Sequence, residues 1–128
     1  PGPVGTVGHC MSGSYIVATA ATYPSRIKAA AAFYGTLIVT DEPDSPHLIA
    51  DRIEGEVYLS FAEVDSYVPD HVPGAIRSAL EKAGVKHTVE VVEGTEHGYC
   101  FPLRPAHHPE AAEAAFQKMC QMFARQLD

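Results

Sequence analysis

The sequence predicts an α/β fold, built from a parallel sheet with helices on both faces. Short apolar segments rich in valine, alanine and aromatic residues alternate with segments whose apolar residues follow helical spacing. Their order is strand, helix, strand, short helix, strand, helix, strand, helix, which is typical of a parallel sheet. The length of 128 residues and the hydrophobic content of 46% fit one globular domain. In such a sheet, ligands bind beyond the carboxyl ends of the strands.

The first two predicted strands enclose an alanine-rich helix. Residues 4–8 form a short apolar run with glycines, which indicates a buried strand. Residues 14–22 are rich in alanine, the best helix former, and Tyr23-Pro24 ends this helix. Residues 27–34 are ambiguous because alanine favours a helix, but the segment is short and a glycine follows it. We therefore predict a second buried strand there.

The middle of the chain predicts a short helix, a strand and a longer helix. Ser45 is placed to cap a short helix that begins at Pro46 and ends near Arg52. Residues 56–62 are β-branched and aromatic, which favours a strand. Residues 70–83 carry apolar side chains at helical spacing, which predicts an amphipathic helix.

The last third of the chain predicts one strand and one long helix. Gly84 stands where the C-terminal cap of the preceding helix is expected. Residues 85–93 contain four valines and favour a strand, and residues 94–98 form a turn-rich loop after it. The final helix opens at residues 108–110 and runs to near Arg125.

Charge and hydropathy exclude several classes of partner. The chain has 9 Lys and Arg residues against 16 Asp and Glu residues, so its formal net charge is −7. A nucleic acid or an anionic membrane surface requires clustered positive charge, so we expect neither as a partner. No apolar run approaches the roughly 20 residues that a membrane span needs.

The cysteine and histidine content predicts free thiols and no metal site. Cys10, Cys100 and Cys120 are odd in number and widely spaced, which does not suit a disulfide framework. Free thiols are typical of a reducing compartment, so we expect a cytoplasmic protein. The cysteines lack zinc-site spacing, and adjacent residues such as His107 and His108 rarely point their side chains the same way. We therefore expect no metal.

The segment from Gly8 to Gly13 predicts a nucleophile on a sharp strand-to-helix turn. Such a turn needs small residues two positions before and after the nucleophile, and Gly8 and Ser12 supply them around Cys10. The turn places Cys10 at a helix N-terminus, where the partial positive charge favours a thiolate. The backbone N–H of Met11 would then point to the position of an oxyanion.

Two later loops supply a candidate base and a candidate acid. His97 follows the last predicted strand, and Asp65 follows the strand before it. The resulting chain order of nucleophile, acid and histidine is the order of α/β hydrolases. Glu63, two residues before Asp65, is the alternative acid.

These segments together resemble the dienelactone hydrolase family (carboxymethylenebutenolidase-like), which has the α/β-hydrolase fold. The resemblance rests on residues 8–13, 61–65 and 94–99 and covers the whole chain, but only about the C-terminal half of the family's fold. It implies that Cys10 is the nucleophile, Asp65 the orienting acid and His97 the general base. The implied reaction hydrolyses a small-molecule ester or lactone through a thioacyl-enzyme, without a cofactor.

The chain departs from the family in two ways. Family members that act on the dienelactone carry arginines for its carboxylate, one of them a few residues after the histidine. Here the first arginine after His97 is Arg104, which argues against the dienelactone as substrate. The family also has several strands before the elbow. We therefore expect a fragment, weakly active or inactive alone, whose apolar edge at residues 4–8 pairs with a missing N-terminal half or with a second copy as a homodimer.

Aromatic side chains near the predicted site are candidates for substrate contact. Tyr34 lies at a strand end, and Tyr99 and Phe101 lie beside His97 in sequence. Cys100 either lines the pocket or packs in the core. Two alternative functions remain open at this point. As alternatives to the hydrolase, the chain could be a non-catalytic fragment that serves binding or dimerisation, or a thiol redox sensor that acts through the oxidation of Cys10.

Overall fold

The computed structural model describes residues 1–128 and contains one four-stranded sheet in which neighbouring strands are parallel. The strands follow one another across the sheet in chain order, so the first and the last are its two edges. They are β1 (Val4–His9), β2 (Ile27–Phe33), β3 (Glu56–Val64) and β4 (His87–Glu96). The predicted α/β class and parallel sheet are confirmed.

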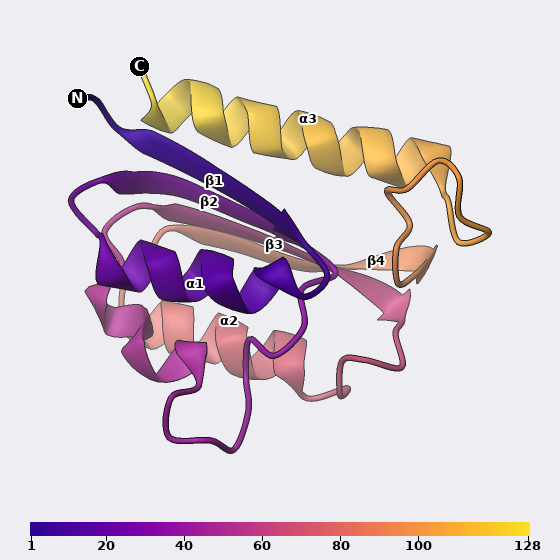
Figure 1. Ribbon diagram of the computed structural model, residues 1–128, viewed down its shortest axis with the longest axis horizontal. Helices are drawn as coiled ribbons and strands as arrows, with labels where there is room; N and C mark the ends of the chain where they lie inside the picture. The colour runs from indigo at the N-terminus through magenta and orange to yellow at the C-terminus, as the bar shows by residue number, and fades with distance from the viewer.

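Helices cover both faces of the sheet, as expected (Figure 1). The segments that connect the strands place their helices on one face, because parallel crossovers between successive strands share one handedness. Helix α3 follows the last strand and packs on the other face (Figure 1). No helix is both long and apolar enough to cross a bilayer. The helical elements are α1 (Ser12–Thr22), the 3₁₀ helix η1 (Pro46–Arg52), α2 (Val72–Lys82) and α3 (Pro109–Gln126).

The alanine run of β2 separates two hydrophobic cores. Side chains alternate between the faces of a strand, so Ala30 and Ala32 join the core under α1 and α2, while Ala29 and Ala31 join the core under α3. All four are buried because both faces of this central strand are covered. Burial on both faces explains why residues with high helix propensity form a strand here.

Two local expectations differ from the structure. β4 continues through the predicted turn at residues 94–98 as far as Glu96, because Gly94 adopts a φ of +77° and the register with β3 shifts between Ala62 and Val64. Ser45 does not cap η1. Its hydroxyl accepts a hydrogen bond from the Thr40 backbone N–H at 2.8 Å instead, which closes the loop before the helix.

The ends of α2 and α3 follow the expected chemistry. Gly84 has a φ of +69° immediately after α2, a conformation that glycine adopts without strain. His108 caps α3, because its Nδ1 accepts a hydrogen bond from the Ala111 backbone N–H at 3.1 Å. These caps set where α2 ends before β4 and where α3 begins after the loop that follows β4.

A buried carboxylate ties α3 to the start of β3. Glu56 is 5% exposed, and its Oε2 accepts a hydrogen bond from Arg125 Nη2 at 2.7 Å. Its Oε1 accepts another from Gln126 Nε2 at 3.0 Å and lies 3.5 Å from Lys86 Nζ. Burial alone would raise the pKa of Glu56, but these hydrogen bonds and positive charges outweigh it and hold the pKa below its usual value.

Glu56→Gln should lower the free energy of unfolding at pH 7 by about 1–2 kcal/mol, because it removes charged hydrogen bonds. The folded-state pKa lies below the ordinary value of 4.5, so the carboxylate stabilises above that pH and loses its effect as the pH falls through the folded pKa. Urea unfolding at pH 7 and at about pH 3 checks this. The exposed Glu54→Gln serves as the control, and an unchanged Glu56→Gln deficit at low pH would contradict the expectation.

Candidate active site

Cys10 stands on a tight turn between β1 and α1. Its φ of +56° lies in the left-handed region, which is strained for a residue with a side chain. The turn closes only because its neighbours are small. A Cβ at Gly8 would lie 2.7 Å from Ile16 Cγ1, and a Cβ at Gly13 would lie 2.4 Å from the Cα of Gly35. The structure therefore contains the predicted strand-to-helix turn, and its close contacts explain why the neighbouring residues are small.

Backbone hydrogen bonds hold this turn against the segment that follows β2. The Cys10 N–H donates to the Phe33 carbonyl at 3.1 Å, and the Cys10 carbonyl accepts from the Thr36 N–H at 2.9 Å. Tyr34 and Leu37, in the same segment, also have positive φ angles, +41° and +58°. The non-glycine residues with positive φ thus occur only in these two adjoining segments, and such strain typically accumulates at functional sites.

The structure brings Cys10, His97 and Asp65 together in one hydrogen-bonded row. His97 Nε2 lies 3.0 Å from Cys10 Sγ, and His97 Nδ1 lies 2.6 Å from Asp65 Oδ2. A carboxylate only accepts hydrogen bonds, so Nδ1 carries the hydrogen and donates it to Asp65. Nε2 is then free to accept the proton of the thiol.

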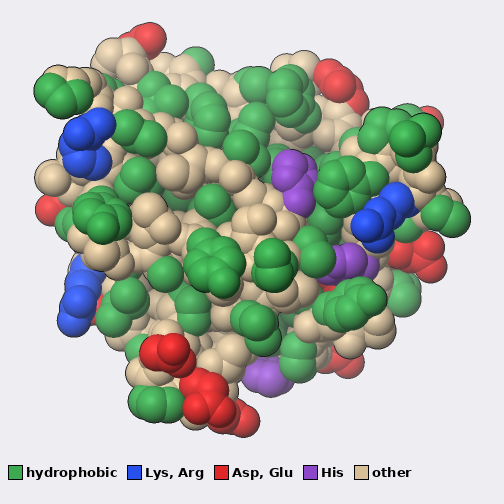
Figure 2. All heavy atoms as spheres, in the orientation of Figure 1, with side chains coloured by type: hydrophobic (Ala, Val, Ile, Leu, Met, Phe, Trp, Pro, Cys, Tyr) green, Lys and Arg blue, Asp and Glu red, His purple; other side chains and the backbone are tan.

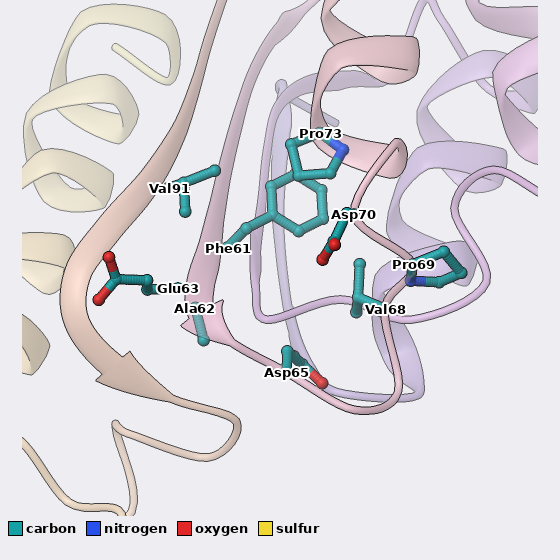
Figure 3. A pocket seen from close by; sticks show the side chains of 9 residues that line it. All are labelled: Phe61, Ala62, Glu63, Asp65, Val68, Pro69, Asp70, Pro73 and Val91. Atoms are coloured by element: carbon teal, nitrogen blue, oxygen red, sulfur yellow. The ribbon is translucent and has the colours of Figure 1, made fainter.

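Asp65 is held in this orientation by its own loop. Its Oδ1 accepts a hydrogen bond from the Tyr67 backbone N–H at 2.9 Å, which leaves Oδ2 for the histidine. The Asp65 side chain is 4% exposed and that of His97 is 12% exposed, so little water competes for the contact. A small cavity of about 80 Å³ lies behind Asp65, between the end of β3 and the start of α2 (Figure 3).

Glu63 has a different partner. Its Oε1 accepts a hydrogen bond from the Gly94 N–H of β4 at 2.9 Å. Figure 3 shows Glu63 beside β4, while Asp65 lies in the loop beyond the end of β3. The two candidate acids are therefore distinguished by geometry, and only Asp65 reaches the histidine.

Aromatic rings surround His97 on two sides. The Tyr34 ring packs edge-on with its centroid 5.1 Å from that of His97, and the Tyr67 ring lies 4.7 Å away. Tyr34 is completely buried, whereas Tyr67 is exposed. The sequence provides no reason to prefer Tyr67 over other loop tyrosines, because its position above the histidine depends on how the loop after β3 folds.

The substrate contacts expected of Tyr34 and Tyr99 do not agree with their burial. Neither residue has any exposed surface: Tyr34 packs against His97, and Tyr99 packs against Tyr34. The Tyr99 hydroxyl is hydrogen-bonded to Ser60, and burial raises the pKa of both tyrosines. Phe101 is 38% exposed and remains accessible beside the site.

Met11 offers an unused backbone donor next to Cys10. Its N–H makes no hydrogen bond within the protein, although the neighbouring Cys10 and Gly13 amides are both engaged. The Met11 N–H, at the start of α1, is therefore available to donate a hydrogen bond to a ligand.

The remaining cysteines lie in the core under α3. Cys100 and Cys120 pack against the buried cluster of that face. Burial raises the pKa of the Cys100 thiol, which disfavours its reactive thiolate. His9, which precedes Cys10, stacks on Phe33 at 5.0 Å, and burial lowers its pKa. No group of three His, Cys, Asp or Glu side chains is arranged to hold a metal ion.

Comparison with protein families identifies the chain. The model of the dienelactone hydrolase family matches residues 1–127. The chain belongs to the dienelactone hydrolase family. Among curated proteins, the "Putative carboxymethylenebutenolidase" of Synechocystis is 35% identical over 130 residues, which cover 99% of this chain and 52% of that protein. The carboxymethylenebutenolidase of Rhodococcus opacus is 27% identical, with 96% of this chain and 50% of that protein covered.

Solved structures agree with this membership of the dienelactone hydrolase family. A crystal structure described as "Putative Dienelactone Hydrolase" from Klebsiella pneumoniae superposes with a TM-score of 0.84 at 27% identity and covers 94% of this chain and 51% of that one. The dienelactone hydrolase-like promiscuous phosphotriesterase P91 superposes with a TM-score of 0.82 at 21% identity, over 98% of this chain and 53% of that one, and shows the shared fold. This chain spans about half the length of the curated relatives it matches.

Proposed function

We propose that this chain carries the catalytic centre of a hydrolase for small esters or lactones, with Cys10 as nucleophile, His97 as general base and Asp65 as the orienting acid. The observation that carries the proposal is the continuous row from thiol to imidazole to carboxylate, with contacts of 3.0 and 2.6 Å. Family membership supports the same chemistry. Phe101 is the exposed aromatic candidate for substrate contact.

The proposed reaction proceeds in two steps. In the first, His97 Nε2 takes the thiol proton while the sulfur bonds to the substrate's carbonyl carbon. The carbon–oxygen bond to the alcohol then breaks, and the alcohol oxygen takes the proton from Nε2, which leaves a thioester on Cys10. In the second step, Nε2 removes a proton from water, the water oxygen attacks the thioester, and the acid is released as the thiol regains its proton.

The Met11 N–H is the proposed donor to the oxyanion that forms in both steps. The Met11 N–H lies next to Cys10 and makes no hydrogen bond within the protein, which supports this role. A second donor would come from a segment placed beside β1, because β1 is an edge strand and Val7 on it is 46% exposed. Loss of one such donor costs about 10²–10³ in kcat, so we expect slow turnover from residues 1–128 without that segment.

Covalent labelling tests the proposal directly. The protein is treated with 4-nitrophenyl acetate, and intact-mass measurement with peptide mapping locates the acetyl group. We expect an adduct on Cys10 ahead of Cys100 and Cys120, because only Cys10 contacts a histidine in a triad. Equal labelling of all three cysteines would refute the nucleophile assignment. Peroxide oxidation confined to Cys10 without any acetylation would favour the redox alternative.

Asp65→Asn should slow acetylation of Cys10 by about 10²-fold, a smaller loss than removal of the histidine. The amide can donate to Nδ1 and so favours the wrong tautomer of the imidazole. The matched control is Glu63→Gln, which changes an acid two residues away that bonds to Gly94 instead. Stopped-flow release of nitrophenolate measures both variants, and a greater loss in Glu63→Gln would reverse the assignment of the acid.

A further inference from the structure

Leu37 combines a strained backbone conformation with an exposed apolar side chain. Its φ of +58° is an outlier for a bulky side chain, and the side chain is 61% exposed. An exposed apolar residue in a strained backbone contributes little to the core, so packing does not explain the conformation. Strain of this kind points to a functional constraint at the position.

The strained segment is fixed relative to the nucleophile. Thr36, immediately before Leu37, donates its N–H to the Cys10 carbonyl, and Gly35 packs against Gly13 at the start of α1. Leu37 therefore extends from a rigid connection to the turn that carries the thiol. Its position relative to Cys10 does not depend on the long loop that follows.

A groove of about 310 Å³ begins at Leu37. Its walls are apolar side chains from three elements: Leu37 and Val39 from the loop after β2, Pro69 from the loop after β3, and Val72 from the start of α2. Figure 1 shows both loops descending on the α1 and α2 side of the sheet. The groove has the size and lining of a small-molecule site.

Tyr67 lies between the groove and the triad. This tyrosine lines the groove, and its ring lies 4.7 Å from the His97 ring. The histidine returns its proton to the leaving oxygen of an ester, so the alcohol portion of the substrate must lie next to Nε2. Tyr67 therefore borders both the groove and the ring of the histidine.

The charges around the groove disfavour an anionic occupant. Asp41 is among its lining residues, and Glu42 and Asp44 follow in the same loop. Neither lysine nor arginine lines it, and His71 is its only basic side chain. Figure 2 shows acidic side chains gathered at the lower edge of this face, with lysine and arginine at its left and right margins. A carboxylate-bearing group is therefore disfavoured.

We infer that this groove binds the apolar, uncharged alcohol portion of an open-chain ester, with Leu37 and Tyr67 as specificity-determining residues. The inference rests on the proposed function and narrows its substrate class from esters or lactones in general to esters whose leaving alcohol carries an alkyl or aryl group. The sulfur of Cys10 bonds to the acyl carbon, the carbon–oxygen bond breaks, and the alcohol leaves through the groove with the proton from His97.

The test keeps the acyl group constant and varies only the alcohol. Phenyl acetate and 4-butylphenyl acetate release phenols of closely similar acidity and leave the same acetyl adduct on Cys10. We expect the butyl compound to acetylate Cys10 about tenfold faster at low ester concentration, because the butyl chain is partly buried in the groove. Intact-mass measurement over time provides both rate constants.

Leu37→Asn is the decisive variant, because asparagine adopts positive φ without strain and lacks the apolar side chain. It should lose the preference for the butyl ester, measured as the ratio of the two acetylation rates within the same variant. Leu48→Asn is the control, since Leu48 is similarly exposed at 55% but lies on η1 outside the groove. Its preference should match that of the unaltered protein.

The outcomes separate the inference from the proposed function. Acetylation of Cys10 at equal rates by both esters would overturn the inference while leaving the hydrolase proposal in place. If neither ester acetylates Cys10, the proposed function fails, and the groove is then tested by NMR with 4-butylphenol alone. Shifts of the Val39 and Val72 methyl signals would support the groove, and unchanged signals would overturn it.

Discussion

His97→Ala is expected to slow acetylation of Cys10 by about 10⁴-fold, the upper end of what a general base contributes. The variant removes the only side chain that is hydrogen-bonded to Sγ, at 3.0 Å, and leaves the thiol without a proton acceptor. Asp65 bonds to Nδ1 and the thiol to Nε2, so the imidazole ring separates the carboxylate from the sulfur and Asp65 does not replace the base. The measurement is the rate of nitrophenolate release, with the acetyl group located by peptide mapping.

The control for this variant is His87→Ala. His87 lies at the start of β4, and its Nδ1 is 2.7 Å from the Val85 carbonyl, away from the row that ends at Cys10. It should acetylate at close to the rate of the unaltered protein. A His97→Ala protein that retains its acetylation rate, with circular dichroism matching the unaltered protein, would show that Cys10 reacts without a base.

Gly13→Ala is expected to destabilise the fold by about 3 kcal/mol, because overpacking at backbone contacts costs most. The added Cβ would lie 2.4 Å from the Cα of Gly35, and a backbone atom cannot move away as a side chain does. Helix α1 would have to separate from the segment after β2, which also holds the Cys10 carbonyl. Acetylation of Cys10 should therefore fall together with stability, as urea unfolding and mass measurement can establish.

Gly74→Ala provides the matched comparison. Gly74 also lies in the first turn of a helix, α2, but a Cβ there would meet nothing within 4 Å. Alanine has the higher helix propensity, so this variant should gain about 0.5–1 kcal/mol. Equal effects of the two substitutions would mean that helix propensity, and not the contact with Gly35, determines the role of Gly13.

The sharp turn at Cys10 could be predicted because its geometry restricts the residue types. Only small neighbours permit the approach of strand, helix and loop, and Gly8, Ser12 and Gly13 are visible as such in the sequence. The alternation of strands and helices was also visible from composition and hydrophobic spacing, although the alanine-rich residues 27–34 were ambiguous between helix and strand. The order of the loops then placed the histidine and the two acids at one end of the sheet.

Other features depend on contacts that no local pattern encodes. Glu63 and Asp65 are two residues apart and would share a face in a continuous strand, so the sequence could not separate them. The register shift between Ala62 and Val64 and the end of β3 give them different partners. The strain at Leu37 has no sequence signal either, because leucine has no preference for positive φ.

The placement of Cys10 and His97 has a practical consequence. They follow β1 and β4, the two outermost strands, yet their side-chain atoms meet at 3.0 Å. Every intervening strand must be correctly seated for that meeting to occur. The rate at which a thiol-reactive dye labels Cys10 should therefore report on the cooperativity of the entire molecule. Partial unfolding of any strand of the sheet would change that rate.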